Sequence, residues 1–445
     1  MRRDLSPIFK AYDVRGIVPD ELDEDAARRI GAATVEFLGA EQLLLGRDCR
    51  LSSPALAAAF IDGATGRGAD VVDIGLASTD LIYFASGDLD LPGAMFTASH
   101  NPPQYNGVKL CRQQAAPIGA ESGLQEIQAL AEADPAPGPR RGALTVEVVL
   151  DRYVDHLLGM IDASALRPLA VVADAANGMG ALTIPAVFER LPLKLIPLFM
   201  ELDGTFPNHP ADPIVPANQE DLRRAVVEHG ADVGLAFDGD ADRVFLVDEQ
   251  AQGVSGSLVT ALVAEVMLER EPGASIIHNL ICSRVVPEVI REQGGTPVRS
   301  RVGHSYIKQL MAETGAIFGG EHSGHFYFRD LFRADSGLAA ALVVLERLSK
   351  AEVPLSELLS PYRRYEASGE INSVVEDPQA SIERVTAAFA DGRQDGLDGL
   401  TVDYDDRWFN VRASNTEPLL RLNVEAGTQE LLELTTAEVL EVIRA

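Results

Sequence analysis

The chain of 445 residues is poor in cysteine and in long apolar runs. Its three cysteines, Cys49, Cys111 and Cys282, form neither a Cys-x-x-Cys pair nor an even set, which excludes a secreted disulfide framework and indicates a reducing compartment. No uninterrupted apolar run approaches the about 18 residues that a membrane span needs. The first residues also lack the apolar segment of a signal peptide. We therefore expect a cytoplasmic protein that contacts no membrane.

Positive charge is also scarce, since 38 Lys and Arg residues stand against 67 Asp and Glu residues and give a net charge of −29. A nucleic acid is therefore not an expected partner. A phosphorylated substrate would have to enter a locally basic cleft, because the chain on average repels anions. The apolar content of 46% and the charged content of 24% are typical of a folded, globular chain.

The length predicts three or four domains. Apolar runs alternate with amphipathic stretches through most of the chain, which is typical of mostly parallel α/β sheets. Near residue 366 the pattern changes to strands framed by two helices. We predict three successive mixed α/β domains plus a smaller C-terminal α+β domain. Their bounds are 1–145, 146–251, 252–365 and 366–445.

Individual elements follow from the same periodicities and from Gly and Pro punctuation. Strands are predicted at 42–46, 69–74, 91–96, 168–174, 232–237, 244–248, 274–279 and 296–301. Helices are predicted at 54–65, 120–133, 146–161, 219–229, 257–269, 284–293, 336–350, 381–390 and 429–444.

Residues 97–102, Thr-Ala-Ser-His-Asn-Pro, follow a predicted strand. Ser99 would lie where that strand ends, at the edge where parallel sheets bind ligands. Pro102 and Pro103 lack backbone donors and force turn geometry, so the hydroxyl would be presented on a stiff loop. Taken alone, the hexapeptide favours an ordinary polar turn, because short motifs often match by chance.

Three carboxylates, of Asp238, Asp240 and Asp242, alternate in a tight loop between two predicted strands. Ligands that are all oxygen suit Mg²⁺ or Ca²⁺ rather than zinc, and Mg²⁺ is the expected ion. An EF-hand is excluded, because Arg243 stands where the turn needs Gly. A phosphatase with Asp238 as nucleophile is a rival interpretation, but it leaves Ser99 without a role. A solvated acidic turn is disfavoured, since close carboxylates repel one another unless a cation neutralises them.

A loop near the C-terminus carries Arg412, Ser414, Asn415 and Thr416 within five residues. Together they offer a guanidinium group, two hydroxyls and an amide, which are the donors that a phosphate dianion requires. Hydroxyl-rich turns also commonly satisfy their own backbone, so the loop alone is compatible with either role.

A third loop contains Glu321, Ser323 and His325. A carboxylate accepts hydrogen bonds and a hydroxyl both donates and accepts, so Glu321 and Ser323 suit the hydroxyls of a sugar. His325 could transfer protons, although a lone histidine is more often structural. Tyr12 and Arg15, in an alternating segment near the N-terminus, are further candidates for the cleft.

Together these loops resemble those of the α-D-phosphohexomutase superfamily, and most closely its phosphomannomutase/phosphoglucomutase branch. The resemblance covers essentially the whole chain. Five motifs carry it, in order: Tyr-Asp-Val-Arg-Gly at 12–16, Thr-Ala-Ser-His-Asn-Pro at 97–102, Asp-Gly-Asp-Ala-Asp-Arg at 238–243, Gly-Glu-His-Ser-Gly-His at 320–325 and Arg-Ala-Ser-Asn-Thr-Glu-Pro at 412–418. It implies four domains around one deep central cleft.

The resemblance also implies a reaction and its residues. The phosphorylated form of Ser99 would convert a hexose 1-phosphate into the 6-phosphate, or the reverse, with a hexose 1,6-bisphosphate as intermediate and activator. The implied catalytic residues are Ser99, Lys109, Arg15, His100 and Arg243. One Mg²⁺ per chain would be held by Ser99, Asp238, Asp240 and Asp242. The implied substrate-binding residues are Tyr12, His304, Lys308, Glu321, Ser323, His325, Arg412, Ser414, Asn415 and Thr416.

Substrate choice stays open at this point. Phosphoglucosamine mutases are similar, but they typically carry Gln at the position of His322 and a different run at 413–416, which favours mannose and glucose phosphates. Relatives often have Lys where this chain has Ile281, and Arg284 is a candidate replacement for that cation. A sugar-phosphate binding protein without activity is the remaining alternative. The expected partners are phosphorylated hexoses, and the expected state is a monomer or a homodimer.

Overall fold

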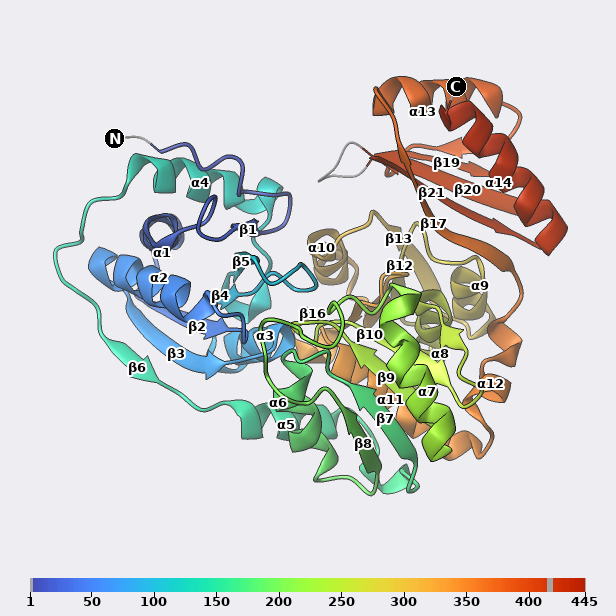
Figure 1. The fold of residues 1–445 in the computed structure, drawn as a ribbon, viewed down its shortest axis with the longest axis horizontal. Coiled ribbons are helices and arrows are strands. Elements are labelled where there is room, and N and C mark those ends of the chain that lie inside the picture. Colours follow the sequence, from blue (N-terminus) through green and yellow to red (C-terminus); the bar gives the residue numbers. More distant parts are fainter. Residues whose placement is uncertain (1–2, 414–418, 445) are drawn as a thin grey trace.

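The computed structural model describes residues 3–413 and 419–444. The predicted phosphate-binding residues Ser414, Asn415 and Thr416 therefore lie outside the described residues. Four sheets follow one another along the chain, three of them mixed and the fourth antiparallel, which confirms the predicted fold class (Figure 1). The predicted residue bounds of the domains stay predictions. In the described part of the chain, no helix is long and apolar enough to cross a membrane.

The first sheet has the strand order β1-β5-β4-β2-β3-β6. Strands β2, β3, β4 and β6 are parallel, whereas β5 runs antiparallel to both β4 and β1. The elements are β1 Val14–Ile17, α1 Glu24–Leu38, β2 Gln42–Arg47, α2 Ser53–Arg67, β3 Asp70–Leu76, α3 Thr79–Leu89, β4 Gly93–Phe96, β5 Tyr105–Cys111, α4 Leu124–Ala133 and β6 Leu144–Val146.

Several features of this domain differ from the sequence prediction, and helices α1 and α3 are among them because neither was predicted. A helix was expected from residue 146, but Leu144–Val146 forms the edge strand β6 and the helix begins only at Leu150. Leu144, Val146 and Val148 alternate with polar residues, and this period of two is typical of a strand. Strand β5 was not predicted. It brings Lys109 next to the end of β4.

The second sheet has the order β11-β10-β9-β7-β8 and the third has the order β13-β12-β14-β15-β16. The second domain contains α5 Leu150–Gly159, β7 Ala170–Asp174, α6 Gly180–Phe188, β8 Lys194–Leu198, α7 Glu220–His229, β9 Val233–Phe237, β10 Val244–Asp248 and β11 Gly253–Val254. The third contains α8 Gly256–Arg270, β12 Ser275–Asn279, α9 Val285–Glu292, β13 Thr296–Ser300, α10 His304–Thr314, β14 Phe318–Gly320, β15 Phe326–Phe328, β16 Ala334–Asp335, α11 Gly337–Ala351 and α12 Leu355–Leu358.

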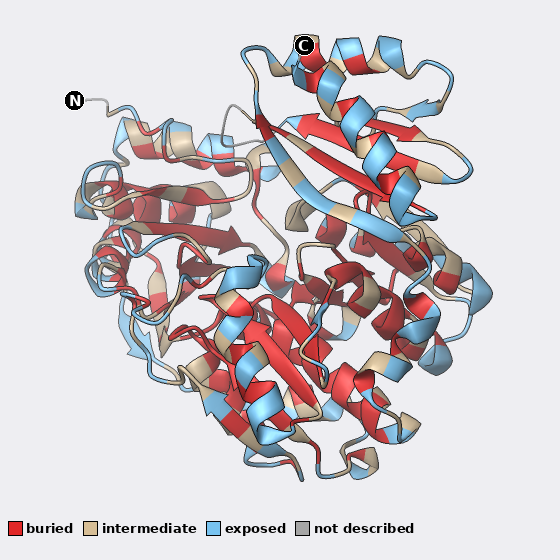
Figure 2. Ribbon diagram, turned by 45° about the vertical axis from the view of Figure 1, so that its right-hand side comes forward, coloured by how far each residue is buried: buried red, intermediate tan, exposed pale blue. Residues whose placement is uncertain are grey.

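The fourth sheet has the order β17-β21-β20-β19-β18, and every pair in it is antiparallel. Its elements are β17 Glu366–Val374, α13 Pro378–Ala388, β18 Arg393–Asp395, β19 Leu400–Asp403, β20 Arg407–Ala413, β21 Leu419–Ala426 and α14 Gln429–Arg444. It has its own apolar core, separate from the core shared by the other domains. Figure 2 shows β17, the strand that enters this domain, as exposed along most of its length, whereas the strands of the other sheets are mainly buried.

The first three sheets share one arrangement of strands. In each, a strand pairs in parallel on one side and antiparallel on the other: β4 lies between β2 and β5, β9 between β7 and β10, and β14 between β12 and β15. Each of these strands is followed by a loop that contains most or all of one predicted motif. The three loops are residues 97–104, 238–243 and 321–325. Ligands bind at the carboxyl ends of such strands, so the fold turns three distant motifs into one site.

The first three domains also meet at the carboxylate of Asp80, near the start of α3. Asp80 accepts hydrogen bonds from Ser78 and from Tyr153 of α5, and from Ser336 at 2.6 Å, just before α11. Its side chain is buried, and burial raises the pKa of this carboxyl group to about 6. The carboxyl group of Asp80 therefore connects the first three domains through hydrogen bonds.

Candidate active site

The loop after β4 holds Ser99 in an unusual backbone conformation. Its φ is 49°, a left-handed value that costs energy for a residue with a side chain. The side chain is buried, and its hydroxyl donates to Asp238 Oδ2 at 2.8 Å. Arg243 Nη2 donates to the same hydroxyl at 3.1 Å, and His100 Nδ1 lies 3.1 Å from it. The serine oxygen is thus held against one carboxylate and one guanidinium group.

Arg50 stabilises this strained loop from beneath. Its guanidinium group donates to the carbonyl oxygens of Ser99 at 2.8 Å, Asn101 at 2.7 Å, Pro102 at 2.8 Å and Tyr105 at 3.1 Å. The side chain is fully buried. One charged group therefore satisfies four carbonyls that would otherwise be costly in a loop without regular structure.

The loop between β9 and β10 brings the three predicted carboxylates together. Asp238, Asp240 and Asp242 are each 0% exposed, and one oxygen of each lies within 4.8 Å of the others. Thr79 Oγ1 donates to Asp240 Oδ2 at 2.7 Å and ties this loop to the start of α3. The expected convergence of three aspartates is therefore present.

Two cations offset most of this negative charge. Lys109 Nζ lies 2.9 Å from Asp240 and 2.6 Å from Asp242, and Arg243 Nε lies 2.9 Å from Asp238. Burial opposes the ionisation of Asp240, but Lys109 outweighs it and holds the pKa of that carboxyl below its usual range. Burial also acts against the charge of Lys109, yet the two aspartates raise its pKa well above the usual value. Lys109 is therefore protonated.

The residues present fit a divalent cation. Oδ1 of Asp240 and Oδ1 of Asp242 are buried and accept no hydrogen bond from the described residues. Buried oxygens of this kind are unfavourable without a partner, and an oxygen-only set is what Mg²⁺ prefers.

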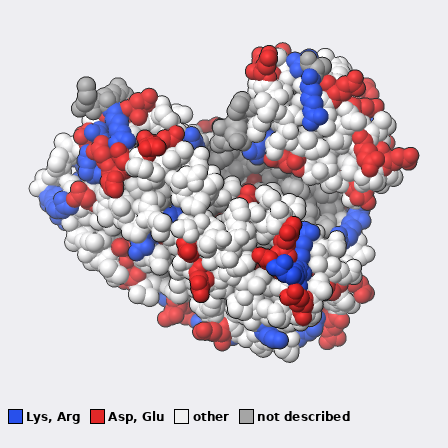
Figure 3. Space-filling model, in the orientation of Figure 1, with Lys and Arg blue, Asp and Glu red and all other residues white. Residues whose placement is uncertain are grey.

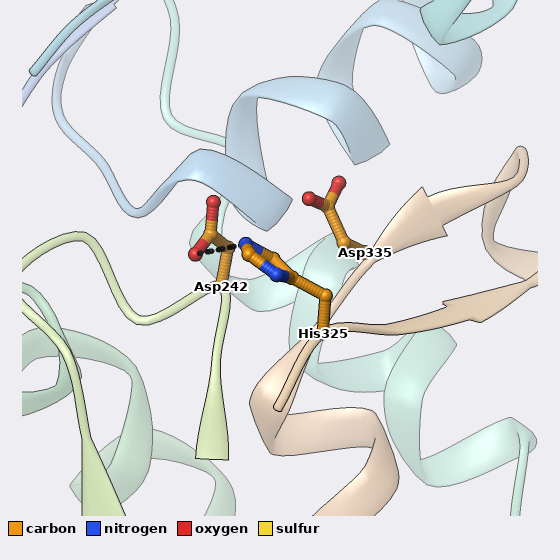
Figure 4. Close-up of side chains that lie close together, drawn as sticks. All are labelled: Asp242, His325 and Asp335. Carbon is orange, nitrogen blue, oxygen red and sulfur yellow. Dashed lines mark ion pairs between the residues drawn. The ribbon is translucent and has the colours of Figure 1, made fainter. Parts of the chain in front are cut away.

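A histidine from the third domain approaches the aspartates (Figure 4). His325 Nε2 lies 3.6 Å from Asp242 Oδ1, and Nδ1 lies 3.5 Å from Glu321 Oε2. The hydroxyl of Ser323 lies 3.0 Å from the same Nδ1. Asp335 also lies close to this ring, so Asp242, His325 and Asp335 form a second cluster of side chains with the ligand atoms for a metal ion. The His325 side chain retains 21% exposure, so it is accessible while contacting two carboxylates.

Glu321 is buried and already bonded on both oxygens. Asn279 Nδ2 and the backbone N–H of Gly303 each donate to Oε1 at 3.1 Å, and the Tyr327 hydroxyl donates to Oε2 at 2.7 Å. The carboxylate therefore has a fixed orientation beside Ser323 and His325. A sugar hydroxyl would use the acceptor capacity that remains.

Tyr12, Arg15 and His304 lie where the first and third domains meet. The Tyr12 hydroxyl donates to the Val302 carbonyl at 3.0 Å, and its ring packs edge-on against His304 at 5.5 Å. Arg15 pairs with Asp13 and donates to Asn101 Oδ1 at 2.5 Å, beside the Ser99 loop. Burial and the nearby Lys308 lower the pKa of His304 well below its usual value, so the ring is neutral.

The predicted cations Lys308 and Arg412 are both paired within the protein. Lys308 is 2% exposed, lies 2.7 Å from Asp335 and sits 3.6 Å from the ring centroid of Tyr83. Arg412, at the end of β20, pairs with Glu370 at 3.1 Å. The chain continues after β20 into residues 414–418, which lie outside the described residues. Figure 3 shows a notch in the surface between the first and fourth domains.

Two residues of the site were missing from the sequence prediction. Arg50 follows β2 in the run Arg47-Asp-Cys-Arg50, and polar residues after a buried strand could have pointed to it. Thr79 offered no comparable pattern, because its role depends on the contact between α3 and the aspartate loop.

Family models match four consecutive segments of the chain. They are described as phosphoglucomutase/phosphomannomutase alpha/beta/alpha domain I at residues 6–136, domain II at 151–253, domain III at 255–365 and C-terminal domain at 370–442. These matches cover most of the chain and occur in the order of the four sheets.

Whole proteins show the same similarity. A phosphomannomutase of Salmonella typhimurium is 45% identical over 448 residues, which cover 98% of each chain. Proteins named phosphohexose mutases of Xanthomonas campestris pv. campestris are 41% identical over 444 residues, covering 98% of this chain and 99% of theirs. The crystal structure of a phosphoglucomutase/phosphomannomutase family protein from Burkholderia thailandensis superimposes with a TM-score of 0.91 at 35% identity, covering 100% of this chain and 98% of that one.

Proposed function

Because the chain belongs to the phosphoglucomutase/phosphomannomutase family and is therefore a phosphohexomutase, we propose that it interconverts mannose 1-phosphate and mannose 6-phosphate, with glucose phosphates as second substrates. The observation that supports this most directly is the position of Ser99. Its hydroxyl lies between Asp238 and Arg243, on a strained loop at the meeting point of three domains.

In the proposed cycle, Ser99 begins phosphorylated. The free hydroxyl of a hexose 1- or 6-phosphate attacks the phosphorus atom, the bond from Ser99 Oγ to phosphorus breaks, and a hexose 1,6-bisphosphate forms. The bisphosphate turns around, and its other phosphoryl group returns to Ser99. Arg15 and Arg243 lie close enough to the loop to stabilise the phosphoryl oxygens during transfer.

Asp238, Asp240 and Asp242, together with the Ser99 oxygen, would hold one Mg²⁺ per chain. When bound, the ion would supply positive charge that neutralises the transferring phosphoryl group. Lys109 lies between Asp240 and Asp242 and remains protonated, so we assign it an electrostatic role. His100 is kept neutral, because burial and Arg243 lower its pKa, and its ring orients the serine.

The proton of the attacking hydroxyl needs an acceptor. Lys109 has no free electron pair while protonated, and His304 is a weak base because burial and the nearby Lys308 lower its pKa well below the usual value. His325 is partly exposed and is polarised by Asp242 and Glu321. We therefore assign proton exchange with the sugar to His325, which would take the proton in one half-reaction and return it in the other.

The phosphate at the far end of the substrate would contact Arg412, Ser414, Asn415 and Thr416 of the fourth domain. Since either end of the bisphosphate must fit there, this loop should bind phosphate and distinguish sugars weakly. Arg284 does not replace the lysine that the family resemblance predicts at the position of Ile281. Its guanidinium group instead contacts Asp403 and the carbonyls of Tyr404 and Arg407. Sugar discrimination then rests on Glu321 and Ser323.

The test combines mass and turnover. Intact-protein mass spectrometry should show an adduct of roughly 80 Da for phosphate, present in the wild type and absent in Ser99→Ala. The matched control Ser164→Ala, at an exposed turn of the second domain, should keep the adduct. The same samples are assayed for conversion of mannose, glucose and glucosamine 1-phosphates to the 6-phosphates.

Each rival makes a different prediction. Release of inorganic phosphate without an adduct would favour the phosphatase with Asp238 as nucleophile. Binding without turnover would favour a sugar-phosphate binding protein, and fastest turnover of glucosamine 1-phosphate would favour a phosphoglucosamine mutase. The monomer or homodimer expected from the sequence stays a prediction that light scattering can test.

A further inference from the structure

A second cavity lies between the third and fourth domains, between α9 and β13 on one side and β18 and β19 on the other. Its volume is about 440 Å³. None of the residues assigned to the mutase reaction lines it. It therefore has to be explained separately from the reaction centre.

The charge of this cavity is opposite to that of the chain. Four arginines line it and only two aspartates do, although acidic residues outnumber basic ones in the whole sequence by 67 to 38. The aspartates are already paired across the domain boundary, Asp395 with Arg299 and Asp403 with Arg284. Among the described residues, none forms a hydrogen bond or an ion pair with the side chain of Arg291, so its positive charge is available.

A buried histidine forms part of the cavity wall. His278 is 6% exposed, and its Nδ1 lies 3.1 Å from the Asn279 carbonyl oxygen. A carbonyl only accepts, so Nδ1 carries the hydrogen and Nε2 keeps a free electron pair. Burial, with a contribution from Arg299 and Arg291, lowers the pKa of His278 to about 4, which keeps the ring neutral. No described residue donates to Nε2.

The cavity thus offers guanidinium donors for an anion and one acceptor for a hydroxyl group. Guanidinium groups recognise phosphate through paired N–H donors, and a volume of about 440 Å³ accommodates a small phosphorylated metabolite. We propose that this cavity binds a phosphate monoester that carries a hydroxyl group. Its phosphate contacts Arg291, and its hydroxyl donates to His278.

Binding would also act on the position of the fourth domain. Arg291, Arg299 and His278 belong to the third domain, whereas Arg393 and Trp408 belong to the fourth. A ligand in this cavity would fill the space between the two walls, so its binding would favour the arrangement in which they face each other. It therefore stabilises one arrangement of the two domains, and with it one width of the catalytic cleft.

Tryptophan fluorescence can follow ligand binding in this cavity. Trp408 is its single tryptophan and lines the cavity. The experiment titrates the full-length protein with glycerol 3-phosphate at constant ionic strength and follows tryptophan fluorescence. Three variants are compared with the wild type: Arg291→Gln, Arg412→Ala in the proposed substrate-phosphate loop, and Arg224→Gln on the exposed face of α7 as the matched control.

We expect a saturable change in the wild type, in Arg412→Ala and in Arg224→Gln, and an affinity about tenfold weaker in Arg291→Gln. Circular dichroism and thermal unfolding should show that Arg291→Gln is folded. A response abolished by Arg412→Ala would place the anion in the active site and overturn the proposal. A response unaffected by Arg291→Gln, or no saturable response in the wild type, would overturn it as well.

Discussion

A methyl group on Gly239 would lie 2.5 Å from the carbonyl oxygen of Ser99. The aspartate loop and the serine loop therefore touch backbone to backbone, and this contact sets the distance between the serine oxygen and the carboxylate of Asp238. Ser99 also has a left-handed φ, so its loop has little freedom to move away. Glycine is required here for packing rather than for its own conformation.

Gly239→Ala is accordingly expected to lower kcat by about 100-fold or more, because a displacement of about 1 Å at a reacting group has effects of that size. Steady-state kinetics and thermal unfolding measure the two consequences. The control is Gly66→Ala in the last turn of α2, where an added Cβ has no neighbour within 4 Å. That variant should keep wild-type kinetics. Wild-type kcat in Gly239→Ala would show that the two loops can separate without loss.

Arg50→Met tests the support beneath the serine loop. It removes hydrogen bonds to four carbonyl oxygens and leaves the buried Asp48 without its ion pair. We expect kcat to fall by at least about tenfold, with a smaller change in KM, because the phosphorylated serine would be misplaced while the substrate contacts remain. The control is Arg67→Met, which replaces a partly exposed arginine that pairs with Glu36, and this variant should be active. Unchanged kcat with only a lower melting temperature would show that Arg50 matters for stability alone.

Asp240→Asn tests the proposed Mg²⁺ site through binding as well as activity. The substitution removes one charge from three converging carboxylates and changes an oxygen that has no hydrogen-bond donor. Calorimetric titration with Mg²⁺ should show an affinity at least about 100-fold weaker than in the wild type. Asp203→Asn, in an exposed loop where the carboxylate bonds Thr205, is the matched control. Equal Mg²⁺ affinity in Asp240→Asn and the wild type would exclude this carboxylate as a ligand.

Asp80 predicts a pH dependence of stability. Its folded-state pKa of about 6 exceeds the value of roughly 3.9 for an exposed aspartate, so the folded state binds the proton more tightly. The resulting stabilisation is fully present below about pH 4 and is lost as pH rises through 6. Its loss amounts to about 3 kcal/mol at most, since each pKa unit corresponds to about 1.4 kcal/mol.

The measurement for Asp80 compares urea unfolding of the wild type and Asp80→Asn between pH 4 and pH 7. The asparagine cannot titrate, so the variant should gain stability relative to the wild type as pH rises. Tyr153→Phe removes one donor to the carboxylate and should enlarge the pH dependence. A free-energy difference between wild type and Asp80→Asn that stays constant across this range would contradict the assignment.

The convergence of the three aspartates could be predicted from the sequence, because the motif that carries them is local. Asp238, Asp240 and Asp242 are neighbours in the chain and need only a tight loop between two strands to converge. The contacts of Arg50 with residues 99–105 and of Thr79 with Asp240 join segments far apart in sequence, and no local pattern specifies them. Periodicity likewise located many helices and strands, but it missed α1, α3 and β5, and with β5 it missed the position of Lys109 against the aspartates.

The repeated connection in the first three sheets has a consequence for how activity can arise. Each domain supplies one loop, so a fragment of the chain that contains a single complete domain carries only one part of the chemistry. In the proposed cycle, Ser99 needs the neighbouring carboxylate of Asp238, and the aspartate loop needs the phosphorylated serine as donor. The proposed reaction centre thus depends on the assembly of the first three domains.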